Sequence, residues 1–158
     1  MLRNQVSESM MEALMRNDVD AIRRLLGSGE DLNATYKTTG LTPILLAVGL
    51  CSAETIQVLL ANGASMSDRD KLGNGPLARA AHGNNIPVMK LLLQRGCRVG
   101  DLNEDGNTPL HLAALNGSDS AARLLLAHGG QADQANNYGI TPRHIARGDP
   151  QRRVPSLM

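Results

Sequence analysis

A proline recurs through this chain at a constant interval, and that spacing limits the possible fold more than any other feature. Four of the seven prolines lie at intervals of 33 residues: Pro43, Pro76, Pro109 and Pro142. Each opens a stretch in which its fixed φ and missing N–H suit the first turn of a helix. A constant period of this length is typical of solenoids, in which small units stack and contact their neighbours. We therefore predict a stack of similar helical units.

A second pattern, formed by apolar residues, recurs with nearly the same period. After Asp18, a plausible helix cap, Ala21, Ile22, Leu25 and Leu26 share one face of a helix that ends at Gly27-Ser28-Gly29. Similar stripes occupy 55–60, 88–93 and 121–126, and each is followed by a glycine. Each unit is thus predicted to hold a short helix, a tight break, a longer helix and an extended connection. Helices this short are marginal alone, so each unit depends on its neighbours.

Composition favours thin helical layers over a core built around a sheet. The chain has no Trp, no Phe and two Tyr, while 42% of its residues are apolar. A net charge of +1 does not suggest nucleic acid or a membrane as partner. Cys51 and Cys97 are too few for a disulfide framework or a metal cluster. No apolar run resembles a signal peptide or a membrane span, so we expect an intracellular protein of the cytoplasm or nucleus. We also expect it to be a monomer.

The segment Thr108-Pro109-Leu110-His111-Leu112-Ala113-Ala114, followed by Gly117, Leu124–Leu126 and Gly129, resembles an ankyrin repeat. The resemblance extends from about residue 10 to residue 147. It implies an all-α repeat solenoid, an ankyrin-repeat stack of helix–turn–helix units with β-hairpin fingers and a concave surface. The expected organisation is a flexible lead-in at 1–9, the ankyrin-repeat domain at 10–148 and a flexible basic tail at 149–158. Within the domain we expect units at about 10–34 (N-terminal cap), 38–70, 71–103, 104–136 and 137–148 (truncated half-unit).

Several residues depart from the family pattern. Ser9 to Glu12 has the form of a capping box that starts the first helix near Met10. Leu45 replaces the motif histidine in the second unit, and Gly75, Ala78 and Arg79 alter the third. The motif Thr and His tie turn to helix in this family, so these two units are expected to be held less firmly than the fourth. Arg143 stands at a core position, which is tolerable only if no further unit covers it.

Candidate chemical motifs point to structural roles. Asp101–Gly106 matches the first half of a calcium-binding EF-hand loop, but Leu112 stands where the bidentate glutamate belongs. A polar finger is therefore favoured. His111 and His144 belong to the repeat motif and have no nucleophile at triad-like placement, so they are expected to be structural. The sequence predicts no enzyme, with no catalytic residue, metal site or cofactor.

The resemblance implies that binding residues lie at the finger tips and at the exposed ends of the inner helices. By position they are Thr39, Leu41, Leu50, Lys71, Leu72, Asn74, His82, Glu104, Asp105, Asn107, Leu115, Asn116, Asn137, Tyr138 and Ile140. The apolar members Leu50, Leu72, Leu115, Tyr138 and Ile140 are expected to form a shallow strip that suits a protein or peptide rather than a small molecule. For each apolar residue, packing against a neighbouring unit remains the alternative.

These observations predict a protein–protein interaction scaffold that binds a partner protein or peptide through its concave face. Rigid presentation of side chains would limit the ordering entropy lost on binding. A regulatory inhibitor that occludes a kinase or a transcription factor is the alternative, and the sequence does not select between them.

Overall fold

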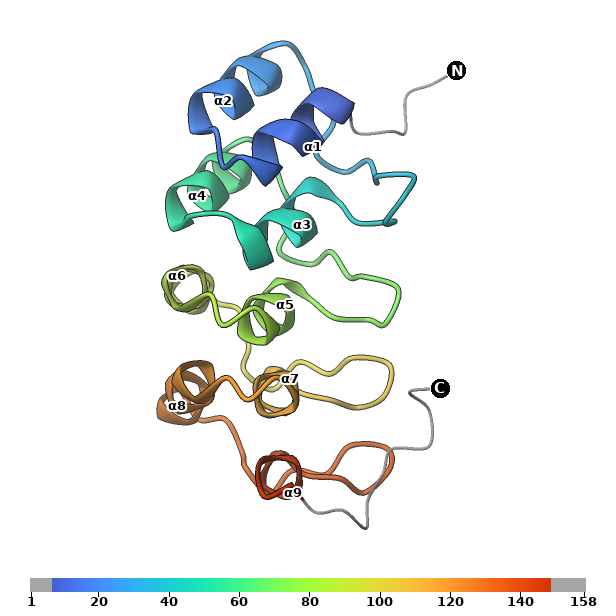
Figure 1. Cartoon of the computed structure of the whole chain (residues 1–158), viewed down its shortest axis with the longest axis vertical. Helices are drawn as coiled ribbons and strands as arrows, with labels where there is room; N and C mark the ends of the chain where they lie inside the picture. The colour runs from blue at the N-terminus through green and yellow to red at the C-terminus, as the bar shows by residue number, and fades with distance from the viewer. Residues whose placement is uncertain (1–6, 149–158) are drawn as a thin grey trace.

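The computed structural model describes residues 7–148, and these fold into nine helices stacked as antiparallel pairs along one axis (Figure 1). The inner layer holds α1 (Glu8–Met15), α3 (Pro43–Leu50), α5 (Pro76–His82), α7 (Pro109–Leu115) and α9 (Pro142–Ala146). The outer layer holds α2 (Val19–Gly27), α4 (Ala53–Ala61), α6 (Ile86–Gln94) and α8 (Asp119–Ala127). The predicted helical repeat stack is confirmed. The lead-in at 1–6 and the tail at 149–158 lie outside the described residues.

The inner helices begin where the proline period predicts. Proline opens α3, α5, α7 and α9, and the hydroxyls of Thr108 and Thr141 accept from the backbone N–H groups of His111 and His144. Asp18 caps α2 as expected. The predicted capping role of Ser9 is wrong, because α1 starts at Glu8 and the Ser7 hydroxyl accepts from Met10 N at 3.1 Å.

The core is a column of apolar side chains shared between successive units. Helices of one layer contact their neighbours along the stack, as α5 does with α3 and α7. Ile56, Leu59, Leu92 and Leu125 are fully buried within this column. Burial of one such side chain contributes about 2 kcal/mol to stability. A helix of seven to nine residues is therefore held by its neighbours rather than by its own hydrogen bonds.

The connections between units project from the inner layer, away from the outer helices (Figure 1). We call them the first to fourth fingers: residues 36–41, 70–74, 103–107 and 136–140. Tight turns close the later three, as when Gly106 N donates to Asn103 O. Gly106 has a φ of +75°, and a Cβ there would meet the Asn137 side chain, so only glycine fits. No β-strand runs through residues 7–148, so the β-hairpin form of the fingers is not confirmed.

Arg143 lies on α9, the last helix of the described residues. Its side chain is exposed, and its Nε lies 2.6 Å from Asp133 Oδ1. In the described residues no outer helix follows α9, and thus nothing buries the guanidinium.

Candidate functional site

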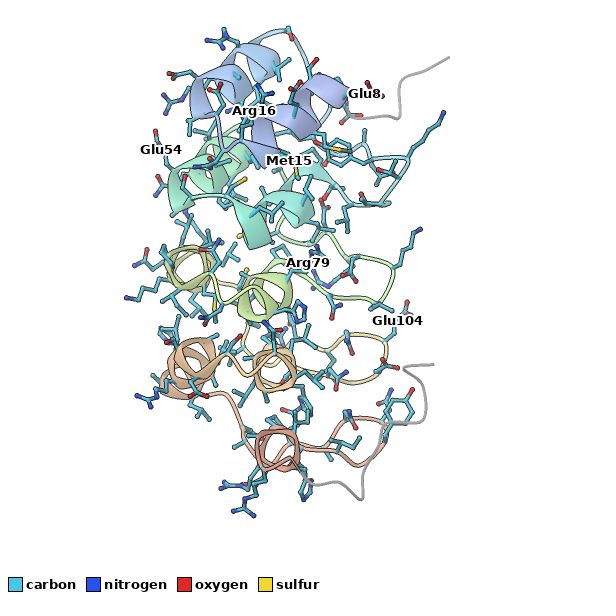
Figure 2. The ribbon with its side chains drawn as sticks, in the orientation of Figure 1. Glu8, Met15, Arg16, Glu54, Arg79 and Glu104 are labelled. Atoms are coloured by element: carbon cyan, nitrogen blue, oxygen red, sulfur yellow. The ribbon has the colours of Figure 1, made fainter. Side chains whose placement is uncertain are left out.

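Apolar side chains are exposed at the C-terminal ends of three of the inner helices. The last residues of α1, α3 and α7 are Met15, Leu50 and Leu115, with exposed fractions of 64%, 57% and 47%. His82 ends α5 between them and is also exposed. Figure 2 shows Met15 where α1 ends. We call these four residues the helix-end column.

Met15 was missed by sequence reasoning. The available signal was its place near the end of the first predicted helix, two residues before the Asn17-Asp18 break. The first unit lacks the proline motif, so position in the repeat did not single out Met15. In the structure α1 contacts α3, and Met15 is the exposed last residue of α1, so it joins the helix-end column.

Three predicted binding residues are interior instead. Leu41, Asn74 and Ile140 are exposed by only 9%, 7% and 5%. They occupy the base of their fingers, where the chain turns back toward the inner helix and lies against the rest of the stack. The Ile140 carbonyl, for example, lies 3.1 Å from His111 Nε2 of the preceding unit. The apolar strip therefore excludes Ile140, and the other two residues offer no free surface.

The remaining predicted residues lie at or near the surface. Exposed members of the set are Thr39, Leu50, Lys71, Leu72, His82, Glu104, Leu115, Asn116, Asn137 and Tyr138. Asp105 and Asn107 are half-buried. Figure 2 shows Glu104 at the tip of the third finger, on the side away from the outer helices. The helix-end column and the fingers together form the candidate surface.

Side-chain oxygens hold the later fingers in shape. The Oδ1 atoms of Asp70, Asn103 and Asn136 each accept two backbone N–H groups of their own finger, at 2.9 to 3.0 Å. Such Asx turns replace the strand pairing that a hairpin would use. The first finger carries Tyr36 at the equivalent position and lacks this arrangement.

Hydrogen bonds also join the later fingers to one another. Glu104 N donates to Leu72 O at 3.1 Å, and Asn137 N donates to Asp105 O at 3.0 Å. The Asn103 side chain donates to Asn74 Oδ1 at 2.9 Å, and the Asn136 side chain repeats this bond to Asn107 at 2.8 Å. The second, third and fourth fingers therefore form one connected surface.

His111 is engaged on both ring nitrogens. Its Nδ1 lies 2.9 Å from Thr108 Oγ1, and its Nε2 lies 3.1 Å from the Ile140 carbonyl. Burial lowers the pKa of His111, against the opposing effect of its hydrogen bond to that carbonyl. A neutral, fully bonded imidazole is a structural link between units and is not placed for acid–base catalysis.

Side chains of the acidic loop before α7 bond to other groups of the protein. Asn103 Oδ1 accepts from two backbone amides, and Asp101 Oδ2 lies 3.4 Å from Arg69 Nη2. Over residues 7–148, no cluster of three His, Cys, Asp or Glu side chains is arranged to hold a metal ion. None of the helices in this part of the chain is long and apolar enough to cross a membrane.

Comparison with known proteins adds independent findings. The family model "Ankyrin repeats (3 copies)" matches residues 10–103 and 80–150. The protein named "Ankyrin repeat, SAM and basic leucine zipper domain-containing protein 1" from Gorilla gorilla gorilla is 33% identical over 84 residues, which is 52% of this chain and 18% of that protein. The Mus musculus protein of that name is 33% identical over 85 residues, 53% of this chain and 18% of its own length. The matches thus span only 18% of the length of these relatives.

Proposed function

Because this chain belongs to the ankyrin-repeat family, we propose that it is a non-catalytic scaffold that binds a partner protein or peptide through the helix-end column and the fingers. Ankyrin repeats are in general protein-interaction modules, and the partner here is a matter for experiment. The observation that carries the proposal is the row of exposed apolar side chains Met15, Leu50 and Leu115 beside polar fingers. Apolar patches with polar rims are typical of protein-binding sites.

Rigidity supports the same proposal. The later three fingers are linked by backbone and side-chain hydrogen bonds, so their tips occupy one arrangement before any partner arrives. A preformed surface loses less conformational entropy on binding than a flexible loop does. Leu72 and Tyr138 at the finger tips are exposed and supply further apolar area. Aromatic side chains are frequent energetic centres of such interfaces.

The test compares matched pairs of leucine substitutions. Leu50→Asp with Leu115→Asp places two charges in the helix-end column. Leu102→Asp with Leu126→Asp makes the same chemical change at two exposed leucines outside that column. We expect the first pair to abolish retention of partner proteins from a cell extract, measured by mass spectrometry, while the second pair retains them. Both pairs should keep nearly the parent melting temperature, because all four side chains are exposed.

Retention of the same proteins by the Leu50→Asp, Leu115→Asp variant would contradict the proposed surface. An inhibitory role toward a kinase or transcription factor would use the same residues, so the same variants test that role as well.

The proposal includes a cytoplasmic or nuclear location and a monomeric state. Analytical ultracentrifugation of the chain alone checks the latter.

A further inference from the structure

Charge is segregated along the row of fingers. One turn position recurs in all four fingers and carries Lys37, Lys71, Glu104 and Asn137 in succession. The residue after Glu104 is Asp105, which adds a second negative charge to the third finger. The row therefore changes from positive in the first two fingers to negative in the third.

The two positive fingers are close neighbours. A Cβ built at Gly40 of the first finger would lie 2.8 Å from Lys71 Cε and 3.5 Å from Lys71 Nζ. The Lys71 side chain of the second finger therefore lies against the first finger, which carries Lys37. Both lysines are exposed, so the positive charge faces solvent.

The negative finger is set at a fixed distance along the stack. The hydrogen bond from Glu104 N to Leu72 O joins it to the second finger, where the exposed Leu72 side chain stands beside the charge boundary. Tyr138 Oη of the fourth finger donates to Asp105 Oδ1 at 2.9 Å, which orients that carboxylate. A tyrosine ring thus lies next to the negative end.

These four charges are not neutralised within residues 7–148. The ion pairs of this region use other residues, such as Arg69 with Asp101 and Arg79 with Asp70. Neither lysine and neither carboxylate of the tips takes part in one. Free charges of this kind steer a partner and select its orientation more than they raise affinity.

We propose that the partner segment recognised by this surface is bipolar. Its acidic end lies over Lys37 and Lys71, its apolar side chains lie on Leu72 and the helix-end column, and its basic end lies over Glu104 and Asp105. A segment in the opposite direction would place like charges together at both ends, which disfavours it. This inference rests on the proposed function, and it adds the charge pattern and direction of the ligand.

The first step of the test is a selection from a random-peptide display library on the immobilised full chain. We expect enriched peptides to carry an acidic cluster and a basic cluster separated by apolar residues. One enriched peptide is then synthesised together with a charge-inverted version, in which acidic and basic residues are exchanged. The parent chain should bind the inverted peptide about tenfold more weakly.

The second step exchanges the charges of the protein. Lys71→Glu with Glu104→Lys keeps the net charge and cancels the polarity of the row, because Lys37 and Asp105 remain and each end then carries one positive and one negative side chain. We expect this variant to bind the original peptide more weakly than the parent chain does and to lose the parent's preference for it over the inverted peptide. The control, Glu54→Lys with Lys90→Glu, makes the same exchange on the exposed face of α4 and α6 and should leave both affinities unchanged.

The possible failures are distinguishable. Suppose that the enriched peptides do not bind the Leu50→Asp, Leu115→Asp variant but have no consistent order of acidic and basic residues. This result would refute the bipolar ligand and would still support the proposed surface. An unchanged preference for the original peptide in the Lys71→Glu, Glu104→Lys variant would also refute the bipolar ligand and not the surface. Enriched peptides that bind the leucine variant as tightly as the parent, or no enrichment at all, would overturn the proposed function and this inference with it.

Discussion

Arg79 of α5 and Asp70 of the second finger form an ion pair, with 2.9 Å between Arg79 Nη1 and Asp70 Oδ2. Arg79 Nε also donates to the Leu45 carbonyl of the second unit at 2.8 Å. In α7 and α9 the link between turn and helix is a reciprocal Thr–His pair. Gly75 and Ala78 cannot make that pair in α5, and the arginine supplies a different connection (Figure 2).

This ion pair predicts that Arg79→Met destabilises the protein by about 2 kcal/mol, measured as the free energy of unfolding in urea. The reason is that the Asp70 carboxylate, whose side chain is 8% exposed, keeps its charge and loses its partner. Arg98→Met is the matched control, because Arg98 and its partner Asp101 are both substantially exposed and the change should have little effect. Equal unfolding free energies for the two variants would refute the structural role of Arg79.

His111 and His144 make a second matched pair. Both bond to their N-cap threonine, but only His111 also reaches the next unit, through the Ile140 carbonyl. We expect His111→Ala to lower the free energy of unfolding by about 2 kcal/mol more than His144→Ala, since it leaves buried polar groups unpaired. Similar losses in the two variants would show that the link to Ile140 contributes nothing.

The same histidine predicts a pH dependence of stability. Burial lowers the pKa of His111 below the ordinary value, which is about 6.5. As the pH falls, the unfolded chain takes up this proton first, so the stability present above about pH 6.5 is lost as the pH falls through the folded-state pKa. Urea titrations between pH 7.5 and 5, values chosen around the ordinary histidine pKa, should show this decline. The decline should be smaller in the His111→Ala variant, and an unchanged slope would contradict the assignment.

Tyr36 carries a buried hydroxyl with no hydrogen-bond partner among the described residues. Burial raises its pKa, so the phenol stays neutral, but its desolvation is uncompensated. We expect Tyr36→Phe to raise the free energy of unfolding by about 1 kcal/mol. Tyr138→Phe, which removes a hydroxyl bonded to Asp105, should give no such gain. A loss of stability in the Tyr36 variant would mean that the hydroxyl has a bound partner.

The first two fingers should be joined less firmly than the later ones. Glu104 N and Asn137 N bond across to the preceding finger, whereas Lys71 N, at the equivalent position, makes no such bond within residues 7–148. Amide exchange measured by NMR should therefore be faster at Lys71 than at the other two positions. Comparable protection at all three would contradict this difference.

Sequence reasoning located the repeat but could not assign burial within it. The proline period correctly predicted the starts of α3, α5, α7 and α9, and Arg143 is exposed on α9. Leu41 and Ile140 are predicted on the surface because their repeat positions place them among the finger tips. Whether such a side chain is buried depends on what lies against it in the folded stack, and this is not encoded in its own repeat.

The sequence by itself determined the unit, its period and its helical starts, because these depend on local properties of proline, threonine, alanine and glycine. The tertiary structure decided which side chains remain exposed and which polar groups find partners. The Arg79–Asp70 pair spans nine residues and the His111–Ile140 bond spans 29, and neither separation follows from helical periodicity. Stacking brings these groups together, and the same stacking leaves Met15, Leu50 and Leu115 exposed at the ends of their helices.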